Sequence, residues 1–325
     1  MTERGAVLLD RPERPGRPGH PLPQGAGRLP AGLLRTARPR QWVKNVLVAA
    51  APAAAGELDS RHNLAQLLVV FTLFTAAASA VYLVNDARDA AADRAHPVKC
   101  RRPVAAGEVP AAVAYAVGAL LAVLAVTGAA ALCNTMTGAL LTAYLSMQLA
   151  YCVWLKHVLV VDMAVVTTGF LLRAMIGGVA LGIPLSRWFL ITTGFGALFM
   201  VAAKRYSEAV QLADGGGATR ALLTEYTTGY LRFVWQLAAG VAVLGYCLWA
   251  LETGGCPASA PCAGGSLLPW RQLSVIAFIL AVLRYAVFAD RGTAGEPEDV
   301  VLRDRPLAVI GLVWAAMYAC AVAGL

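Results

Sequence analysis

Three aspartates near the end of an apolar stretch have the spacing of one helix face. Asp86, Asp89 and Asp93 are separated by three and four residues, which in a continuous α-helix places their carboxylates within roughly 60° of one another. Carboxylates this close repel unless a cation lies among them. Mg²⁺ typically binds one or two carboxylates together with substrate phosphates. We therefore predict that these three aspartates bind Mg²⁺ and form the catalytic centre.

Cationic side chains follow the aspartates along the chain. The predicted substrate-binding residues of this stretch are Asn85, Arg94, His96, Lys99 and Arg102, and Arg101 lies among them. Arginine and lysine side chains bind phosphate oxygens, so this order of charges predicts a site for a metal-bridged diphosphate. The alternative is a solvated, charge-balanced loop that only fixes membrane topology. Such a loop needs basic residues but does not need three acids on one face.

Further polar residues stand at the ends of apolar stretches or inside them. Lys44 and Asn45 open the first stretch, and Arg173 lies near the middle of another. An ionisable group inside a membrane is costly and is usually paired or functional. The alternatives here are a structural pair between Asp162 and Lys156, and for Arg173 a partner inside the bundle instead of an anionic substrate. The other predicted substrate-binding residues are Tyr151, Lys156, Asp162, Lys204 and Glu208.

The elements that must position these residues are membrane helices. Of the 325 residues, 58% are apolar and only 14% are charged, against about 25% charged in ordinary soluble domains. The mean hydropathy is +0.63. Because stretches of about 17 to 25 apolar residues span a bilayer, we predict an all-α polytopic membrane protein with nine transmembrane helices. Their approximate ranges are 43–56, 64–84, 110–132, 135–155, 158–183, 188–203, 230–251, 271–289 and 306–324.

The basic residues predict the orientation of these helices. With the N-terminus in the cytoplasm, 22 of the 27 lysine and arginine residues lie in cytoplasmic segments or at their edges, as the positive-inside rule requires. The predicted site residues, apart from Arg173, then lie at the cytoplasmic side. This asymmetry and the attraction of basic segments to anionic lipid explain the net charge of +8 without nucleic-acid binding.

Outside the predicted nine-helix domain at 36–325, residues 1–35 are rich in Arg, Pro and Gly. This composition predicts a disordered cytoplasmic tail. A disulfide between Cys256 and Cys262 is an even alternative to two free thiols, because both lie in a predicted outside loop. Glycines at 177–178 and at 194 and 196 would allow the close helix contacts of a homo-oligomer.

The pattern Asn85-Asp-x-x-Asp-x-x-x-Asp93 resembles the first acidic motif of the UbiA superfamily of intramembrane prenyltransferases. The stretches 38–45, 82–103, 151–157 and 184–206 are similar to the phosphoribosyl-transferring branch of that superfamily. Glu208 stands alone where many members carry two aspartates, which fits this branch better than the aromatic branch. The resemblance implies a nine-helix bundle with two cytoplasmic polar clusters that hold Mg²⁺ and diphosphate over a lipid-accessible cavity in a bacterial cell membrane.

The resemblance further implies an activity. The chain would transfer 5-phosphoribose from phosphoribosyl pyrophosphate to a polyprenyl (decaprenyl) phosphate and release pyrophosphate, in the synthesis of a cell-wall arabinan precursor. We expect Arg94, Lys99 and Arg102 to bind the pyrophosphate or the 5-phosphate. Lys44, Lys156 and Lys204 are candidates for the acceptor phosphate. Gathering both anions at one place supplies much of the catalysis.

Two other functions are compatible with a polytopic membrane protein. An aromatic-acceptor polyprenyltransferase would use a polyprenyl diphosphate, and it needs fewer cations because it binds no second phosphorylated substrate. A transporter would place polar groups at the middle of the membrane, whereas here they gather at one face. We therefore favour the phosphoribosyl transfer.

Overall fold

The computed structural model describes residues 29–213, 221–252 and 268–323, and the regular structure within these ranges is entirely helical. Seven of the described helices are long and apolar enough to cross a membrane, which confirms the prediction of an all-α polytopic membrane protein. They are α3 (Arg61–Arg88), α5 (Ala111–Leu132), α6 (Thr135–Val153), α7 (Val161–Ala180), α9 (Thr228–Leu251), α10 (Trp270–Asp290) and α12 (Arg305–Ala323). Each coincides with one of the nine predicted spans.

The other two predicted spans take different forms. The range 43–56 is not one long helix but a 3₁₀ helix, η2 (Pro39–Ala49), followed by the short α2 (Ala50–Ala55). A 3₁₀ helix rises about 2.0 Å per residue against about 1.5 Å for an α-helix, so this segment reaches further than an α-helix of equal length. The range 188–203 lies inside α8 (Arg187–Ala213), which has 27 residues and is not among the seven apolar helices.

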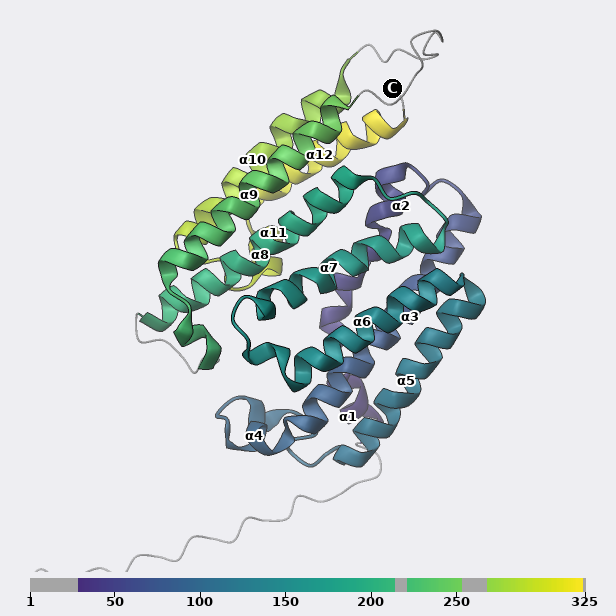
Figure 1. Cartoon of the computed structure of the whole chain (residues 1–325), viewed down its shortest axis with the longest axis vertical. Helices are drawn as coiled ribbons and strands as arrows, with labels where there is room; N and C mark the ends of the chain where they lie inside the picture. The colour runs from purple at the N-terminus through teal and green to yellow at the C-terminus, as the bar shows by residue number, and fades with distance from the viewer. Residues whose placement is uncertain (1–28, 214–220, 253–267, 324–325) are drawn as a thin grey trace, which may run out of the picture.

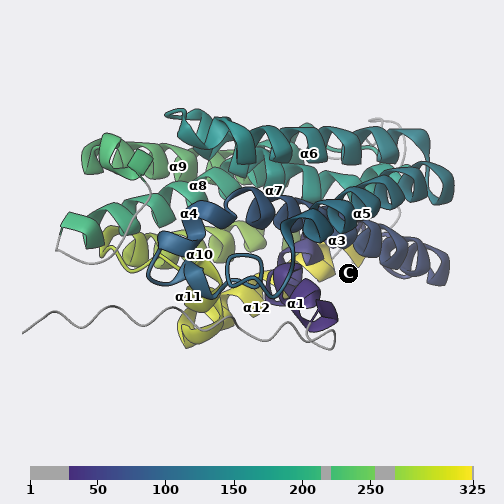
Figure 2. The same cartoon turned by 90° about the horizontal axis from the view of Figure 1, so that it is seen from below.

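Short helices occupy the connections. They are α1 (Leu29–Thr36), α4 (Ala90–Ala95), η3 (Lys99–Arg101), η4 (Leu155–His157), η5 (Ala221–Glu225) and α11 (Pro297–Arg303). Helix α1 begins inside the predicted tail, because Leu29 and Leu33 pack against a small core that includes Leu83, Val104 and Val109. Residues 29–35 are therefore helical, and residues 1–28 lie outside the described ranges. Figure 2 views α1 and α4 from the end of the molecule at which they lie.

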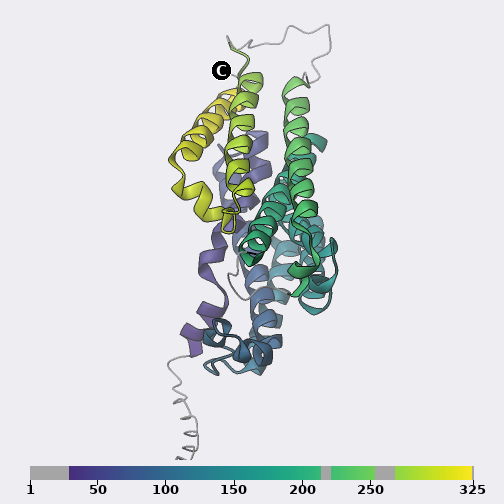
Figure 3. The ribbon, with the colours of Figure 1, turned by 90° about the vertical axis from the view of Figure 1, so that its left-hand side faces the viewer.

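Helix α7 lies between two groups of helices (Figure 1). It contacts α6 on one side and α8 on the other. One apolar core contains Met163 together with residues of α8, α9 and α10, and the other contains Ile176 together with residues of α3, α5 and α6. Figure 3 shows α10 and α12 running alongside each other. The two ends of α7 thus belong to different cores, and its amino-terminal end lies at the junction where polar residues gather.

The backbone of η2 passes directly over α7. A Cβ atom at Gly177 would lie 1.9 Å from the carbonyl oxygen of Val48, and one at Gly178 would lie 2.9 Å from the Cβ of Ala51. Only glycine permits this approach. These two glycines, which we expected to allow contacts between copies of the chain, therefore pack inside it.

Capping residues begin two of the long helices. Asn134 Oδ1 accepts a hydrogen bond from the Thr137 amide at 2.8 Å at the start of α6, and Thr227 Oγ1 accepts one from the Tyr230 amide at 3.1 Å at the start of α9. Such caps satisfy amides that have no partner inside the helix. The five cysteines in the described ranges are free, whereas Cys256 and Cys262 lie outside those ranges.

Candidate active site

The three aspartates do not share one continuous helix. Asp86 lies on α3 and Asp93 on α4, and Asp89 joins the two helices with a ψ of 1°. The α-helical ψ is about −42°, so the chain changes direction at Asp89. The prediction of a single carboxylate face is therefore wrong at its middle member.

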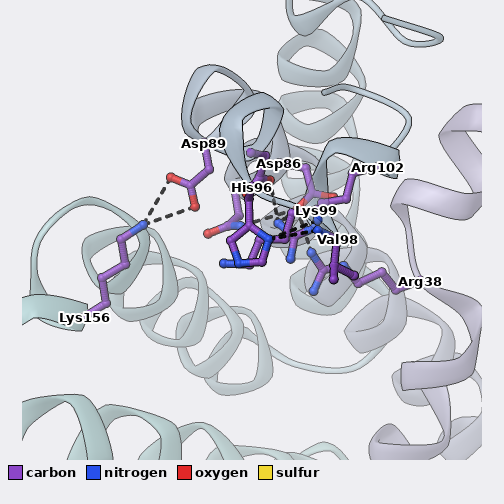
Figure 4. A network of polar contacts seen from close by, with 10 residues as sticks. Arg38, Asp86, Asp89, His96, Val98, Lys99, Arg102 and Lys156 are labelled. Carbon is purple, nitrogen blue, oxygen red and sulfur yellow. Dashed lines mark hydrogen bonds and ion pairs between the residues drawn. The ribbon is translucent and has the colours of Figure 1, made fainter. Parts of the chain in front are cut away.

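Asp86 and Asp93 nevertheless converge on one cation, Arg102, which Figure 4 shows beside Asp86. Nη1 of Arg102 lies 3.2 Å from Oδ1 of Asp86 and 2.7 Å from Oδ2 of Asp93. The two carboxylate side chains are only 3% and 6% exposed. Buried carboxylates need a cation or several donors, and Arg102 supplies positive charge to both.

Arg38 is a second cation on Asp86, and sequence reasoning did not assign it to the site. Its Nη2 donates to Asp86 Oδ1 at 2.6 Å, and its guanidinium lies 4.7 Å from the centre of the Tyr82 ring. Its φ is 56°, an uncommon conformation for a residue other than glycine. The available signal was its place among the cations that open the first apolar stretch, but its contact is 48 residues away.

Asp89 pairs with a lysine and not with Arg38 or Arg102. Nζ of Lys156 lies 3.1 and 3.2 Å from the two carboxylate oxygens of Asp89, and in Figure 4 this pair stands apart from Asp86 and Arg102. Lys156 belongs to η4, the turn between α6 and α7. The structure thus brings Lys156 to the acidic motif and not to Asp162, so the alternative of a Lys156–Asp162 pair is wrong.

The remaining predicted residues around the motif have smaller roles in its geometry. Asn85 Nδ2 lies 3.4 Å from Asp86 Oδ1, and Arg94 Nε donates to the carbonyl of Ala105 at 3.1 Å. His96 Nδ1 accepts from the amides of Val98 and Lys99. Arg94 and His96 therefore shape the loop after α4, while Lys44, Lys99 and Tyr151 are half-buried.

The carboxylates of Asp86 and Asp93 suit the kind of Mg²⁺ binding in which the protein supplies only a few of the metal's ligands. Within the described ranges, no three His, Cys, Asp or Glu side chains converge closely enough to hold a metal by themselves. Asp86 and Asp93 do converge, and carboxylate oxygens are ligands that Mg²⁺ prefers, with substrate phosphates completing the shell. The site therefore suits a metal that arrives with a phosphorylated substrate.

A second polar cluster lies on α7, α8 and the segment before α9. Nη2 of Arg205 lies 3.3 Å from Oδ2 of Asp162, and its Nη1 donates to Glu208 Oε2 at 3.1 Å. Lys204 Nζ lies 3.5 Å from Glu208 Oε1 and donates to the carbonyl of Gly295 at 2.6 Å. The predicted residues Asp162, Lys204 and Glu208 thus come together, around an arginine that sequence reasoning did not select.

Tyr226 completes this second cluster. Its hydroxyl donates to Asp162 Oδ1 at 2.6 Å and accepts from the Val160 amide at 2.6 Å. Val160 has a φ of 67°, a strained conformation for a β-branched residue that persists only where its surroundings enforce it. Burial and the hydrogen bond to Asp162 raise the pKa of Tyr226, so its hydroxyl remains a neutral donor at physiological pH.

Arg173 is held by uncharged partners inside the bundle. It donates to Asn45 Oδ1 at 3.1 Å, to the Gly169 carbonyl at 3.0 Å and to the Tyr144 hydroxyl at 2.9 Å. Asn45 in turn donates to Thr75 Oγ1 at 3.0 Å. Of the two alternatives for Arg173, the structure shows partners inside the bundle. These hydrogen bonds connect η2 to α3, α6 and α7.

The chain is similar to known proteins over nearly its whole length. The profile of the UbiA prenyltransferase family matches residues 45–303. The chain is 49% identical over 304 residues to the decaprenyl-phosphate phosphoribosyltransferase of Mycobacterium tuberculosis strain H37Rv, covering 92% of this chain and 97% of the relative. It is 43% identical over 300 residues to the protein of the same name from Corynebacterium glutamicum, covering 90% and 86%.

Solved structures support the fold. A UbiA homologue from Archaeoglobus fulgidus bound to GPP and Mg²⁺ superposes with a TM-score of 0.65 at 15% identity, covering 90% of this chain and 100% of that one. A structure described as digeranylgeranylglyceryl phosphate synthase superposes with a TM-score of 0.62 at 14% identity, covering 91% and 99%. At these identities the likeness concerns the fold alone.

Proposed function

The chain belongs to the UbiA prenyltransferase family, and from that premise we propose that it transfers 5-phosphoribose from phosphoribosyl pyrophosphate to decaprenyl phosphate and releases pyrophosphate. The similarity to relatives of that name from two bacterial genera, at 43% and 49% identity across almost the full length of both chains, carries this proposal. The buried Asp86–Arg102–Asp93 group supports it, since it combines metal-binding oxygens with a phosphate-binding cation.

The first polar cluster, formed by Asp86, Asp93, Arg38 and Arg102, would bind the leaving pyrophosphate. Asp86 and Asp93 would hold Mg²⁺, which neutralises charge that develops on the pyrophosphate. Arg38 and Arg102 already lie within hydrogen-bond distance of these carboxylates, so their remaining N–H groups can donate to pyrophosphate oxygens. Groups arranged before the reaction and buried away from water stabilise developing charge most effectively.

The reaction exchanges one C–O bond for another at C1 of the ribose. The bond from C1 to the pyrophosphate oxygen breaks and the pyrophosphate leaves with the electron pair. An oxygen of the lipid phosphate forms the new bond to C1 from the opposite face. This oxygen is already ionised at neutral pH, so the step needs no strong general base, and positioning both anions supplies most of the catalysis.

An apolar groove on the surface of η2 and α2 suits the hydrocarbon of the acceptor. It has a volume of about 440 Å³, and the residues that line it are Val43, Val46, Leu47, Ala49, Ala50 and Ala53. Lys44 lies on the same segment, so we assign the acceptor phosphate to Lys44, with Lys204 as the second candidate. The tail would then follow the groove into the bilayer.

We further infer that the clusters face the cytoplasm of a bacterial plasma membrane. The distribution of lysine and arginine supports this orientation, and the relatives are bacterial. Phosphoribosyl pyrophosphate is a water-soluble anion that cannot cross the bilayer unaided, so the donor must reach the clusters from the aqueous side on which they open.

Release of pyrophosphate by the purified protein tests this function. We expect Mg²⁺-dependent release that requires both phosphoribosyl pyrophosphate and decaprenyl phosphate, with one pyrophosphate for each ribosylated lipid found by mass spectrometry. A parallel reaction with decaprenyl diphosphate and 4-hydroxybenzoate tests the aromatic alternative. Pyrophosphate release only in the parallel reaction would contradict the proposal.

A further inference from the structure

A small pocket lies beside the acidic motif, between the turn after α6, helix α8 and the segment before α9. The residues that line it are Lys156, Asp162, Arg205, Leu222, Leu223 and Tyr226. The pocket has a volume of about 10 Å³, room for one water-sized group, and it opens into about 200 Å³ of space that includes solvent. Unlike the groove on η2, this pocket is lined by two cations.

Arg205 brings an unused donor to this pocket. Its side chain is 6% exposed, and its two terminal nitrogens face Asp162 and Glu208. Its Nε is buried and has no hydrogen-bond partner among the described residues. Because a buried N–H without an acceptor is unfavourable, an anion whose oxygen came within hydrogen-bond distance of this nitrogen would be stabilised.

Lys156 connects the pocket to the acidic motif. Its Nζ contacts both oxygens of Asp89, and an ammonium group has three N–H donors. It can therefore donate to Asp89 and to an anion in the pocket at the same time. The pocket and Asp89 are thus separated by a single side chain.

We propose that this pocket binds a phosphate monoester, the 5-phosphate of the ribosyl donor. The inference rests on the proposed function, in which the donor carries a diphosphate on C1 and a phosphate on C5 of one sugar ring. Such a molecule needs two anion sites one sugar apart. The Asp86–Asp93 group and its arginines form one of them, and Lys156 and Arg205 form the other. Lys156 then serves the donor and not the acceptor phosphate expected from the sequence.

The lipid phosphate is also a monoester, and the pocket fits it less well. Leu222, Leu223 and Tyr226 belong to the segment between α8 and α9, outside the seven apolar helices. A polyprenyl phosphate must keep its tail on apolar surface continuous with the bilayer, and the apolar groove runs along η2 and α2. A water-soluble donor has no such requirement.

Two donors that differ only in the 5-phosphate test the assignment. We would compare kcat/KM for phosphoribosyl pyrophosphate with that for ribose 1-diphosphate, which has a 5-hydroxyl, in the wild type, Lys156→Met and Lys99→Met. Effects common to both donors cancel in the ratio of the two values. We expect the ratio to fall about ten- to hundred-fold in Lys156→Met, as for the loss of a charge-assisted hydrogen bond. Lys99→Met should slow both donors and leave the ratio as in the wild type.

Binding of ribose 5-phosphate gives a second measurement that does not depend on turnover. In the wild type, ribose 5-phosphate should compete with the donor, and it should compete more strongly than ribose does. In Lys156→Met and Arg205→Lys its competition should be weaker than in the wild type. Thermal unfolding of each variant establishes that it is folded. If Arg205→Lys does not fold, the comparison of Lys156→Met with the wild type is sufficient for the test.

The proposal is overturned if Lys156→Met has the wild-type ratio, if only its KM for the lipid changes, or if Lys99→Met changes the ratio instead. Wild-type protein that transfers nothing from phosphoribosyl pyrophosphate would refute the proposed function, which is a different result.

Discussion

Arg38 Nη2 lies 2.6 Å from Asp86 Oδ1, and this contact joins the start of η2 to the end of α3 across 48 residues. One of the two cations that bind Asp86, the least exposed carboxylate of the motif, therefore depends on where η2 lies. Other contacts also hold η2: Asn45 bonds to Arg173 and Thr75, and Val48 packs against Gly177. The first apolar segment is thus part of the site's framework and not merely a membrane anchor.

Replacing Gly177 with alanine should displace η2. The new Cβ would meet the Val48 carbonyl oxygen at 1.9 Å, a backbone atom that cannot rotate away, and overpacking of this kind costs about 1–3 kcal/mol. We expect Gly177→Ala to lower both the thermal midpoint and the transfer rate. Gly196→Ala is the matched control, because its Cβ would meet nothing within 4 Å. Equal stability and activity of the two variants would show that η2 is not held in this way.

Asp86→Asn should weaken the binding of Mg²⁺ with little change in shape. We expect transfer to fall by about 10²- to 10³-fold, the range found when one charge-stabilising group is removed from an active site, and to require more Mg²⁺ for half-maximal rate. Asp304→Asn is the control, because Asp304 is also bound by an arginine, Arg284, at 2.8 and 3.0 Å, but lies outside both clusters. Its Mg²⁺ dependence should equal that of the wild type, and a change there as large as in Asp86→Asn would argue against the metal site.

Tyr226→Phe removes one hydroxyl that makes two hydrogen bonds. It leaves the part-buried Val160 amide without a partner and removes one of the groups that bind Asp162, and a buried group left unpaired costs about 1–3 kcal/mol. We expect reduced activity and stability, whereas Tyr230→Phe, whose ring stacks on Tyr226 at 5.8 Å, should behave as the wild type.

The pH dependence of the same variant has a defined sign. The pKa of Tyr226 is raised above the usual value of about 10, so the hydroxyl keeps its proton up to at least that pH. The ratio of wild-type to Tyr226→Phe activity should therefore be constant from about pH 6 to pH 9. A ratio that falls within this range would mean that Tyr226 loses its proton there.

Arg173→Gln tests whether Arg173 stabilises the fold or binds a substrate. The shorter amide cannot reach Asn45, Gly169 and Tyr144 together, so we expect a loss of stability of about 1–3 kcal/mol for each buried partner left unpaired, measured by thermal unfolding in detergent. Arg232→Gln, at a half-exposed side chain, should lose much less. Unchanged stability together with a raised KM for either substrate would instead place Arg173 at the substrate.

The sequence was sufficient to predict the parts of the molecule that depend on local patterns. Apolar length predicted the seven long spans, and the spacing of Asp86 and Asp93 next to Arg102 predicted a polar group that the structure assembles. The break at Asp89 was not predictable from spacing, because an i, i+3, i+7 pattern assumes one helix. Aspartate is common at helix caps, which was the available sign of a break.

Residues whose role depends on distant partners were missed. Arg205 is ordinary as one of several cations at the end of α8, and it becomes notable only because Asp162, from another helix, lies against it. Tyr226 likewise acts on Val160 and Asp162, which precede it by 66 and 64 residues. Contacts at such separations arise from tertiary packing, and a single sequence carries no local pattern for them.

The most direct test of the central claim follows the ribose itself. Purified protein would be incubated with Mg²⁺, decaprenyl phosphate and phosphoribosyl pyrophosphate labelled in the ribose, and label would be counted in the organic phase with and without a chelator. We predict that label enters the lipid in the wild type and is lost with the chelator and in Asp86→Asn. Folded wild-type protein that leaves all label in the aqueous phase would contradict the account.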